Sequence, residues 1–166
     1  MLAYALIGYI GIALGYVPDE AINVFAAHPT LSYMAAGTTS GNVVILSTSS
    51  TVQSISTISV STSDVYGRMA WAPSLVHLAL LVVPNVVKIL RFSDVSTGSV
   101  DSTMVLEHTF PVSAVGWVLV TPDAPVVLVG TMNGFIDKYT VGGAVILESS
   151  RDFRRYVGCE VVFLHS

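Results

Sequence analysis

Short apolar runs separated by turn-forming residues are the most regular feature of this chain. The runs are rich in Val, Ile, Leu and Ala, and Gly, Pro, Asn and Ser interrupt them at intervals too short for long helices. Such a pattern is typical of strands in an all-β protein. It predicts twelve strands, over residues 22–27, 31–36, 43–46, 51–59, 68–72, 75–83, 86–92, 103–109, 113–120, 125–130, 135–139 and 143–148.

The predicted strands form three copies of one sequence unit. A shift of 44 residues carries Pro29 onto Pro73 and aligns the apolar positions that follow without a gap. A shift of 93 residues carries Gly37 onto Gly130, together with the hairpin around it. A unit of four short antiparallel strands at this period matches one blade of a β-propeller. The repeat therefore predicts β-propeller blades of four antiparallel strands.

The third copy contains extra residues. It follows the second copy at a distance of 49 residues, whereas Trp71 and Trp117 in the two first strands are only 46 residues apart. The additional residues must lie between the first two strands of the copy, around Leu119 to Ala124. We expect them at a turn, where repeat folds accept insertions.

The copies divide the chain into five segments. Blades one, two and three are expected over residues 21–63, 64–111 and 112–150, after an apolar N-terminal segment over 1–20. Residues 151–166 are expected to start a further blade, because Tyr156–His165 has the pattern of a first inner strand. Closed propellers have about 4–8 blades. We therefore expect a fragment, or an incomplete propeller that other protein subunits, remaining blades or a second copy complete as a homodimer.

Three segments resemble the WD40-repeat family. Met69–Pro73 is similar to the first inner strand of that family, and Ala35–Leu46 and Val129–Tyr139 are similar to its second strand, hairpin and third strand. The resemblance covers roughly residues 22–150. It is degenerate: no copy opens with Gly-His or ends in Trp-Asp, and the positions of the family's Trp hold Leu46, Leu90 and Tyr139. The resemblance implies a scaffold that makes protein–protein contacts.

The uncharged segment Met1–Val17 allows three interpretations. Its Tyr, Ile and Leu residues suit edge strands of a preceding blade, and its glycines disfavour a water-soluble helix. As a membrane helix it is short of about 20 residues, although Gly11 and Gly15 have the GxxxG spacing of packed membrane helices. As a signal peptide it lacks a positively charged start. The strand interpretation is our first choice.

The charge and cysteine content of the chain limit the classes of binding partner and the compartment that we expect. Hydrophobic residues make up 52% of the chain and charged residues 11%, with a net charge of −4 and no dense basic stretch. No footprint for nucleic acid is visible in that distribution. The low charge favours a surface covered by other protein. Cys159 is the only cysteine, which excludes an internal disulfide and suits a reducing, cytoplasmic compartment.

No catalytic, metal or cofactor motif is present in the sequence. His28, His77, His108 and His165 are far apart and have no metal-ligand spacing, so we interpret them as surface or satisfied core residues. GxSxG, GxGxxG and Walker patterns are lacking. A Ser/His/Asp group assembled in space is left open, and with it an unrecognised hydrolase site.

The densest charge lies in Arg151-Asp-Phe-Arg-Arg155. A solvated loop between two blades is the simplest interpretation. The alternative is contact with an anionic partner through Arg151, Arg154 and Arg155, because guanidinium groups pair with carboxylates in a bidentate manner.

These features together predict a non-enzymatic, WD40-like interaction scaffold within a larger complex. The second hypothesis is a membrane-anchored propeller that uses residues 1–17 as its anchor, and the third is a small hydrolase.

Overall fold

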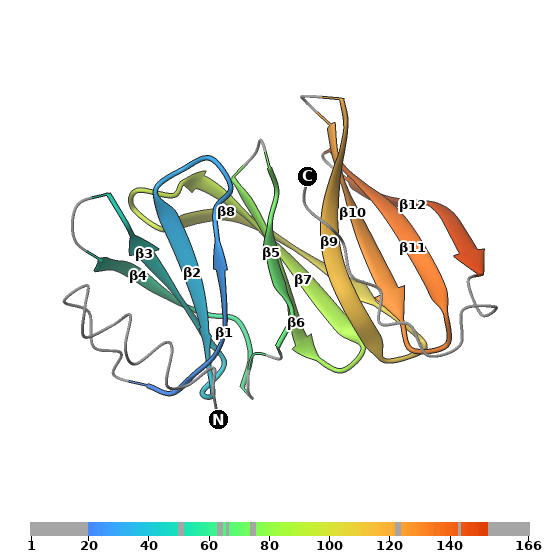
Figure 1. Cartoon of the computed structure of the whole chain (residues 1–166), viewed down its shortest axis with the longest axis horizontal. Coiled ribbons are helices and arrows are strands. Elements are labelled where there is room, and N and C mark those ends of the chain that lie inside the picture. Colours follow the sequence, from blue (N-terminus) through green and yellow to red (C-terminus); the bar gives the residue numbers. More distant parts are fainter. Residues whose placement is uncertain are drawn as a thin grey trace.

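Three four-stranded antiparallel sheets stand side by side in chain order (Figure 1). A computed structural model describes residues 20–49, 52–62, 65, 67–73, 76–121, 124–142 and 144–152. Each sheet is a meander in which sequence neighbours pair, so the strand order within each sheet follows the chain. This is the arrangement of propeller blades, and over the described residues the sheets do not close into a ring.

The strand bounds follow the repeat. The first blade contains β1 (Ile22–Ala27), β2 (Tyr33–Thr38), β3 (Asn42–Ser47) and β4 (Gln53–Ser59). The second contains β5 (Met69–Trp71), β6 (His77–Val83), β7 (Val86–Asp94) and β8 (Ser99–Glu107). The third contains β9 (Val112–Thr121), β10 (Ala124–Thr131), β11 (Phe135–Gly142) and β12 (Ala144–Asp152).

All twelve predicted strands are present, and the all-β prediction is confirmed. The Ser/Thr-rich stretch over residues 51–59 contains the outer strand β4, and its side chains alternate between half-buried and exposed from Ser56 to Ser59. The extra residues of the third copy lie where they are expected, at the connection between its first two strands. They lengthen β9 and β10 there, so that Leu119 pairs with Pro125 and Thr121 with Ala124.

The first strands of the blades form the inner layer. β5 lies beside both β1 and β9, and the sheets fan out from these three strands (Figure 1). One apolar core lies between blades one and two and contains Ile45, Trp71, Leu80 and Phe92. A second lies between blades two and three and contains Leu81, Ile89, Trp117 and Val127.

The second blade contributes both of its faces to these cores. Along β6, Leu78, Leu80 and Val82 face the first core, and Ala79 and Leu81 face the second. Continuous apolar runs such as HLALLVV suit a strand that is buried on both sides. The second blade is therefore an internal layer.

Matching hairpins connect β2 to β3 and β10 to β11. Gly41 and Gly134 have φ values of 81° and 89°, which side chains other than glycine adopt only with strain. In both hairpins a threonine hydroxyl secures the turn. Thr38 Oγ1 accepts the backbone N–H of Asn42, and Thr131 Oγ1 donates to Asn133 Oδ1. The residues aligned by the 93-residue shift thus perform the same structural role.

Candidate functional site

A repeated tryptophan contact joins each blade to the one before it. The indole N–H of Trp71 on β5 donates to the carbonyl oxygen of Ala26 on β1 at 3.0 Å. The indole N–H of Trp117 on β9 donates to the carbonyl oxygen of Ala70 on β5 at 2.9 Å. Both rings are almost fully buried. Because buried indole nitrogens need a partner, these bonds fix the spacing of the inner strands.

A histidine ring lies against each of these tryptophans. His28 packs on Trp71 with ring centroids 5.3 Å apart, and His77 packs on Trp117 at 6.2 Å. His28 follows β1, whereas His77 opens β6, so the two histidines come from different strands of their blades. Burial and then the charge of Arg91 lower the pKa of His77. A neutral imidazole is therefore favoured against the second indole.

The inner strands line a groove of about 780 Å³, whose lining residues are apolar and aromatic. Its walls come from all three blades, and none of its side chains carries a charge. Several remain open to solvent: Phe25 is 42% exposed, Val118 41% and Leu119 44%. The lining residues are Phe25, Ala26, Ala27, Pro29, Met69, Ala70, Trp71, Pro73, Trp117, Val118 and Leu119.

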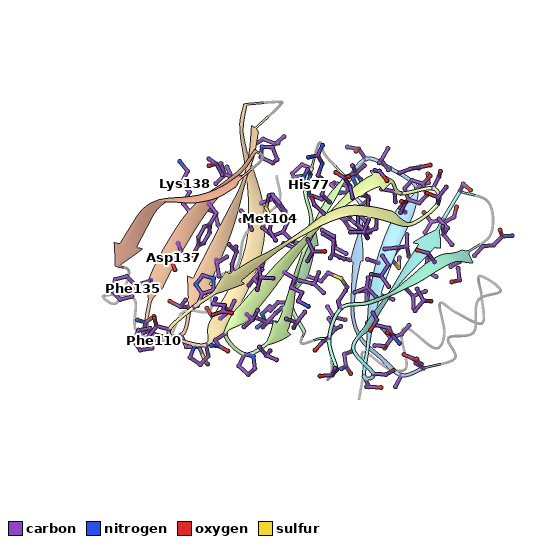
Figure 2. The ribbon with its side chains drawn as sticks, turned by 180° about the vertical axis from the view of Figure 1, so that it is seen from behind. His77, Met104, Phe110, Phe135, Asp137 and Lys138 are labelled. Carbon is purple, nitrogen blue, oxygen red and sulfur yellow. The ribbon has the colours of Figure 1, made fainter. Side chains whose placement is uncertain are left out.

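A polar pair stands away from this groove, between the buried His108 and the half-buried Asp137. His108 Nδ1, in the connection between β8 and β9, lies 3.2 Å from Asp137 Oδ2 on β11, and the imidazole packs edge-on against Tyr139. Figure 2 shows Asp137 on β11 and His77 on the neighbouring blade. Burial and then Asp137 raise the pKa of Tyr139. Among the described residues no hydroxyl bonds to His108 Nε2, so a Ser/His/Asp relay is not assembled around it.

The structure places the predicted site residues as follows. Arg151 lies in β12 opposite Ile136, so the prediction of a loop is wrong there: backbone pairing with β11 continues to Asp152. Arg154 and Arg155 lie outside the described residues, as do Met1–Val17 and His165. Contact of the three arginines with an anionic partner stays a prediction.

His28, His77 and His108 are buried and therefore are not surface residues. His77 and His108 are not fully satisfied core residues either, because His77 Nδ1 and His108 Nε2 have no hydrogen-bond partner among the described residues. Over the described part of the chain, no three His, Cys, Asp or Glu side chains come together as a metal site. The same part contains no helix long and apolar enough to cross a membrane.

The chain is similar to a known protein in structure but not in sequence. No family model and no curated protein matches the sequence. The crystal structure of Sqt1 from Saccharomyces cerevisiae, a WD40 propeller protein, is similar to the chain with a TM-score of 0.62. The match covers 80% of this chain and 35% of Sqt1, at 12% identity.

The fold is that of β-propeller blades. At this identity the likeness concerns the fold only, and the chain spans about a third of the length of the Sqt1 chain.

Sequence reasoning missed the groove. Part of its exposed wall comes from Val118 and Leu119, which lie near the end of the predicted strand 113–120. The available signal was their polarity, because inserted turn residues are usually polar and these are not. Nothing in the sequence pattern showed that Phe25, 93 residues from Val118 in the chain, lines the same groove.

Proposed function

We propose that this chain is a non-enzymatic interaction module that binds an apolar segment of another protein in the groove of its inner strands. The observation that carries the proposal is the uncharged groove itself, with large apolar side chains left exposed on two different blades. Exposed apolar surface of this kind is typical of binding sites.

The groove is continuous with the contacts between blades. Trp71 and Trp117 form part of its wall and also fix the inner strands to one another. A site built on packed strands keeps its shape without a partner, so little ordering is required on binding. The lack of charge on the lining side chains favours an apolar occupant over a charged peptide or nucleic acid.

The test uses binding of the purified chain to an array of short peptides that differ in apolar content. We expect apolar peptides to bind the unmodified chain and Leu119→Asp to weaken that binding at least about tenfold, because a carboxylate would be desolvated in the complex. Met132→Asp is the matched control. Met132 is 74% exposed in the turn before β11 and is not part of the groove.

Circular dichroism of both variants establishes that the strands are retained. Equal peptide binding by Leu119→Asp and Met132→Asp would show that the groove is not the binding site. Preference for charged peptides would contradict the proposed partner chemistry and favour the arginine contact predicted at 151, 154 and 155.

A further inference from the structure

The groove of the inner strands is lined by equivalent positions of the three blades. The shift of 44 residues aligns Ala27 with Trp71, and the 46-residue spacing of the tryptophans aligns Trp71 with Trp117. All three residues line the groove. Blade one therefore contributes a methyl group at the position where the other two blades contribute an indole ring.

The side of the groove that lacks an indole is also open to solvent. Ala27 and Pro29 are exposed, and Phe25 is 42% exposed. The counterparts of Phe25 and Pro29 on blade two, Met69 and Pro73, are half-buried. A ring placed on the blade-one side would bury apolar side chains only, because no lining side chain is charged.

The lining side chains favour one kind of aromatic ring. Trp71 and Trp117 donate their indole N–H groups to backbone carbonyls, and no side chain of the groove offers an oxygen or nitrogen acceptor. A tyrosine or tryptophan of a partner would find no side-chain acceptor for its O–H or N–H group, whereas a phenyl ring needs none. The groove therefore suits phenylalanine best.

Strand β1 also presents a backbone edge beside these exposed side chains. Among the described strands it pairs with β2 alone. His28 donates its backbone N–H to the carbonyl oxygen of Tyr33 at 2.8 Å, in register with the β1–β2 ladder. Because hydrogen-bonded positions alternate along an antiparallel ladder, Phe25 and Ala27 direct their N–H and C=O groups away from β2. An extended peptide can pair with an edge of this kind.

We propose that the segment bound in the groove is extended and that it carries a phenylalanine, whose ring packs on Phe25, Ala27 and Pro29 in place of the indole that blade one lacks. Aromatic rings are effective anchors, because one ring buries a large apolar area. This inference rests on the proposed function and names the residue by which the groove selects its partner.

Two matched peptides test the inference. One is uncharged, with alternating Val and Ser and a central Phe, and the other has Ala in place of that Phe. Titration of the full chain should show at least about tenfold tighter binding of the Phe peptide, because its ring leaves water on binding. Equal affinities would overturn the inference.

Ala27→Trp fills the same space from within the chain. It should reduce the preference for the Phe peptide to less than about twofold, because the chain's own ring then occupies the site of the peptide's ring. Ala21→Trp is the matched control: Ala21 is exposed just before β1 and lies outside the groove, so the preference should not change. An unchanged preference in Ala27→Trp would contradict the inference.

Circular dichroism establishes whether Ala27→Trp retains its strands. If they are lost, Phe25→Ser is used instead, because it removes one of the three contacts of the ring and should lower the preference at least about threefold. The same preference in a folded Phe25→Ser variant as in the unmodified chain would show that the ring does not lie there.

Methylation of the peptide's backbone nitrogens tests the extended conformation. A strand pairs through one edge, so methyl groups on one alternate set of residues should weaken binding at least about tenfold and those on the other set should not. Equal effects of the two sets would mean that the peptide is not paired with a strand edge.

Leu119→Asp separates this inference from the proposed function. If it weakens both peptides, and the two peptides bind the unmodified chain equally, the groove is the binding site and only the phenylalanine contact is wrong. If it weakens neither peptide, the proposed function is wrong and the inference fails with it.

Discussion

Single residues determine how closely neighbouring segments of the chain approach. Gly37 on β2 is an example, because a Cβ atom there would lie 2.7 Å from Val65 Cγ1 and 2.8 Å from Val24 Cγ1. Both distances are below normal carbon contact, so Val65 could not keep its place against β2 beside a larger residue. Val65 also donates its backbone N–H to the carbonyl oxygen of Thr38.

His77 gives the molecule a predictable response to acid. Its pKa lies below the ordinary value of 6.5, first because burial disfavours the charged ring and second because Arg91 repels it. The unfolded chain therefore binds a proton at a higher pH than the folded chain does. The contribution of His77 to the free energy of unfolding should therefore be constant above about pH 7. Below that, the free energy of unfolding should fall as the pH is lowered toward about 5.

Urea unfolding at several pH values measures this effect. His77→Gln should flatten the decline between about pH 7 and 5, and Arg91→Gln should reduce it less, because repulsion is the smaller of the two causes. Parallel curves for the unmodified chain and His77→Gln would show that His77 is protonated equally in both states.

Whole strands are positioned by contacts between residues of neighbouring blades that lie far apart in sequence. The turn between β7 and β8 reaches the outer strand of blade one, where Gly98 lies against Ser56 on β4. Lys88 on β7 donates to the carbonyl oxygen of Val60, just after β4. Blade two is thus joined to blade one at its outer strands as well as at its inner ones.

Gly98→Ala should weaken this outer contact. A Cβ atom would fall 1.7 Å from Ser56 Oγ, and the φ of 67° strains any residue other than glycine. We expect a loss of about 2–4 kcal/mol in the free energy of unfolding. Chemical denaturation measures it.

Adding Ser56→Gly separates the two causes, because it removes the steric clash and leaves the backbone strain. Gly98→Ala should therefore destabilise the Ser56→Gly variant by less than half as much as it destabilises the unmodified chain. An equal loss of free energy of unfolding in both backgrounds would show that the β7–β8 turn does not pack on β4.

Most strands could be predicted well because they are short, apolar and bounded by turn residues. Asn133-Gly134 marks its hairpin by composition alone, and the structure has the positive φ that this turn requires. The predicted ends of β9 and β10 at their connection, residues 120 and 125, lie within one residue of the observed ones. What the pattern could not show is how blades contact one another. The bond from Trp117 to Ala70 spans 47 residues and depends on packing between sheets, which local patterns do not encode.

At the scale of the whole molecule, the apolar composition predicts association. Hydrophobic residues make up 52% of the chain and charged residues 11%, and blades bury their faces only against neighbouring blades. We expect the purified chain to self-associate or aggregate when no partner is present.

Light scattering after gel filtration, without detergent, measures the mass in solution. A discrete dimer would support a ring completed by two copies, and aggregation rescued by another protein would support completion by a different subunit. A stable monomer at neutral pH would contradict the view that blade faces remain uncovered.

The burial of β6 on both faces has a consequence for how the chain finds its correct pairing. In a strand with one solvent-exposed face, a register shift of one residue places polar side chains in the core, and the shifted pairing is unstable for that reason. HLALLVV contains no such marker beyond its first residue, so a slipped β6 would still be apolar on both sides. The choice must come from size: Leu78 and Leu80 fill one core, while Ala79 leaves room in the other, where Trp117 packs. Correct assembly of this protein therefore depends on the volumes of its side chains more than on their polarity.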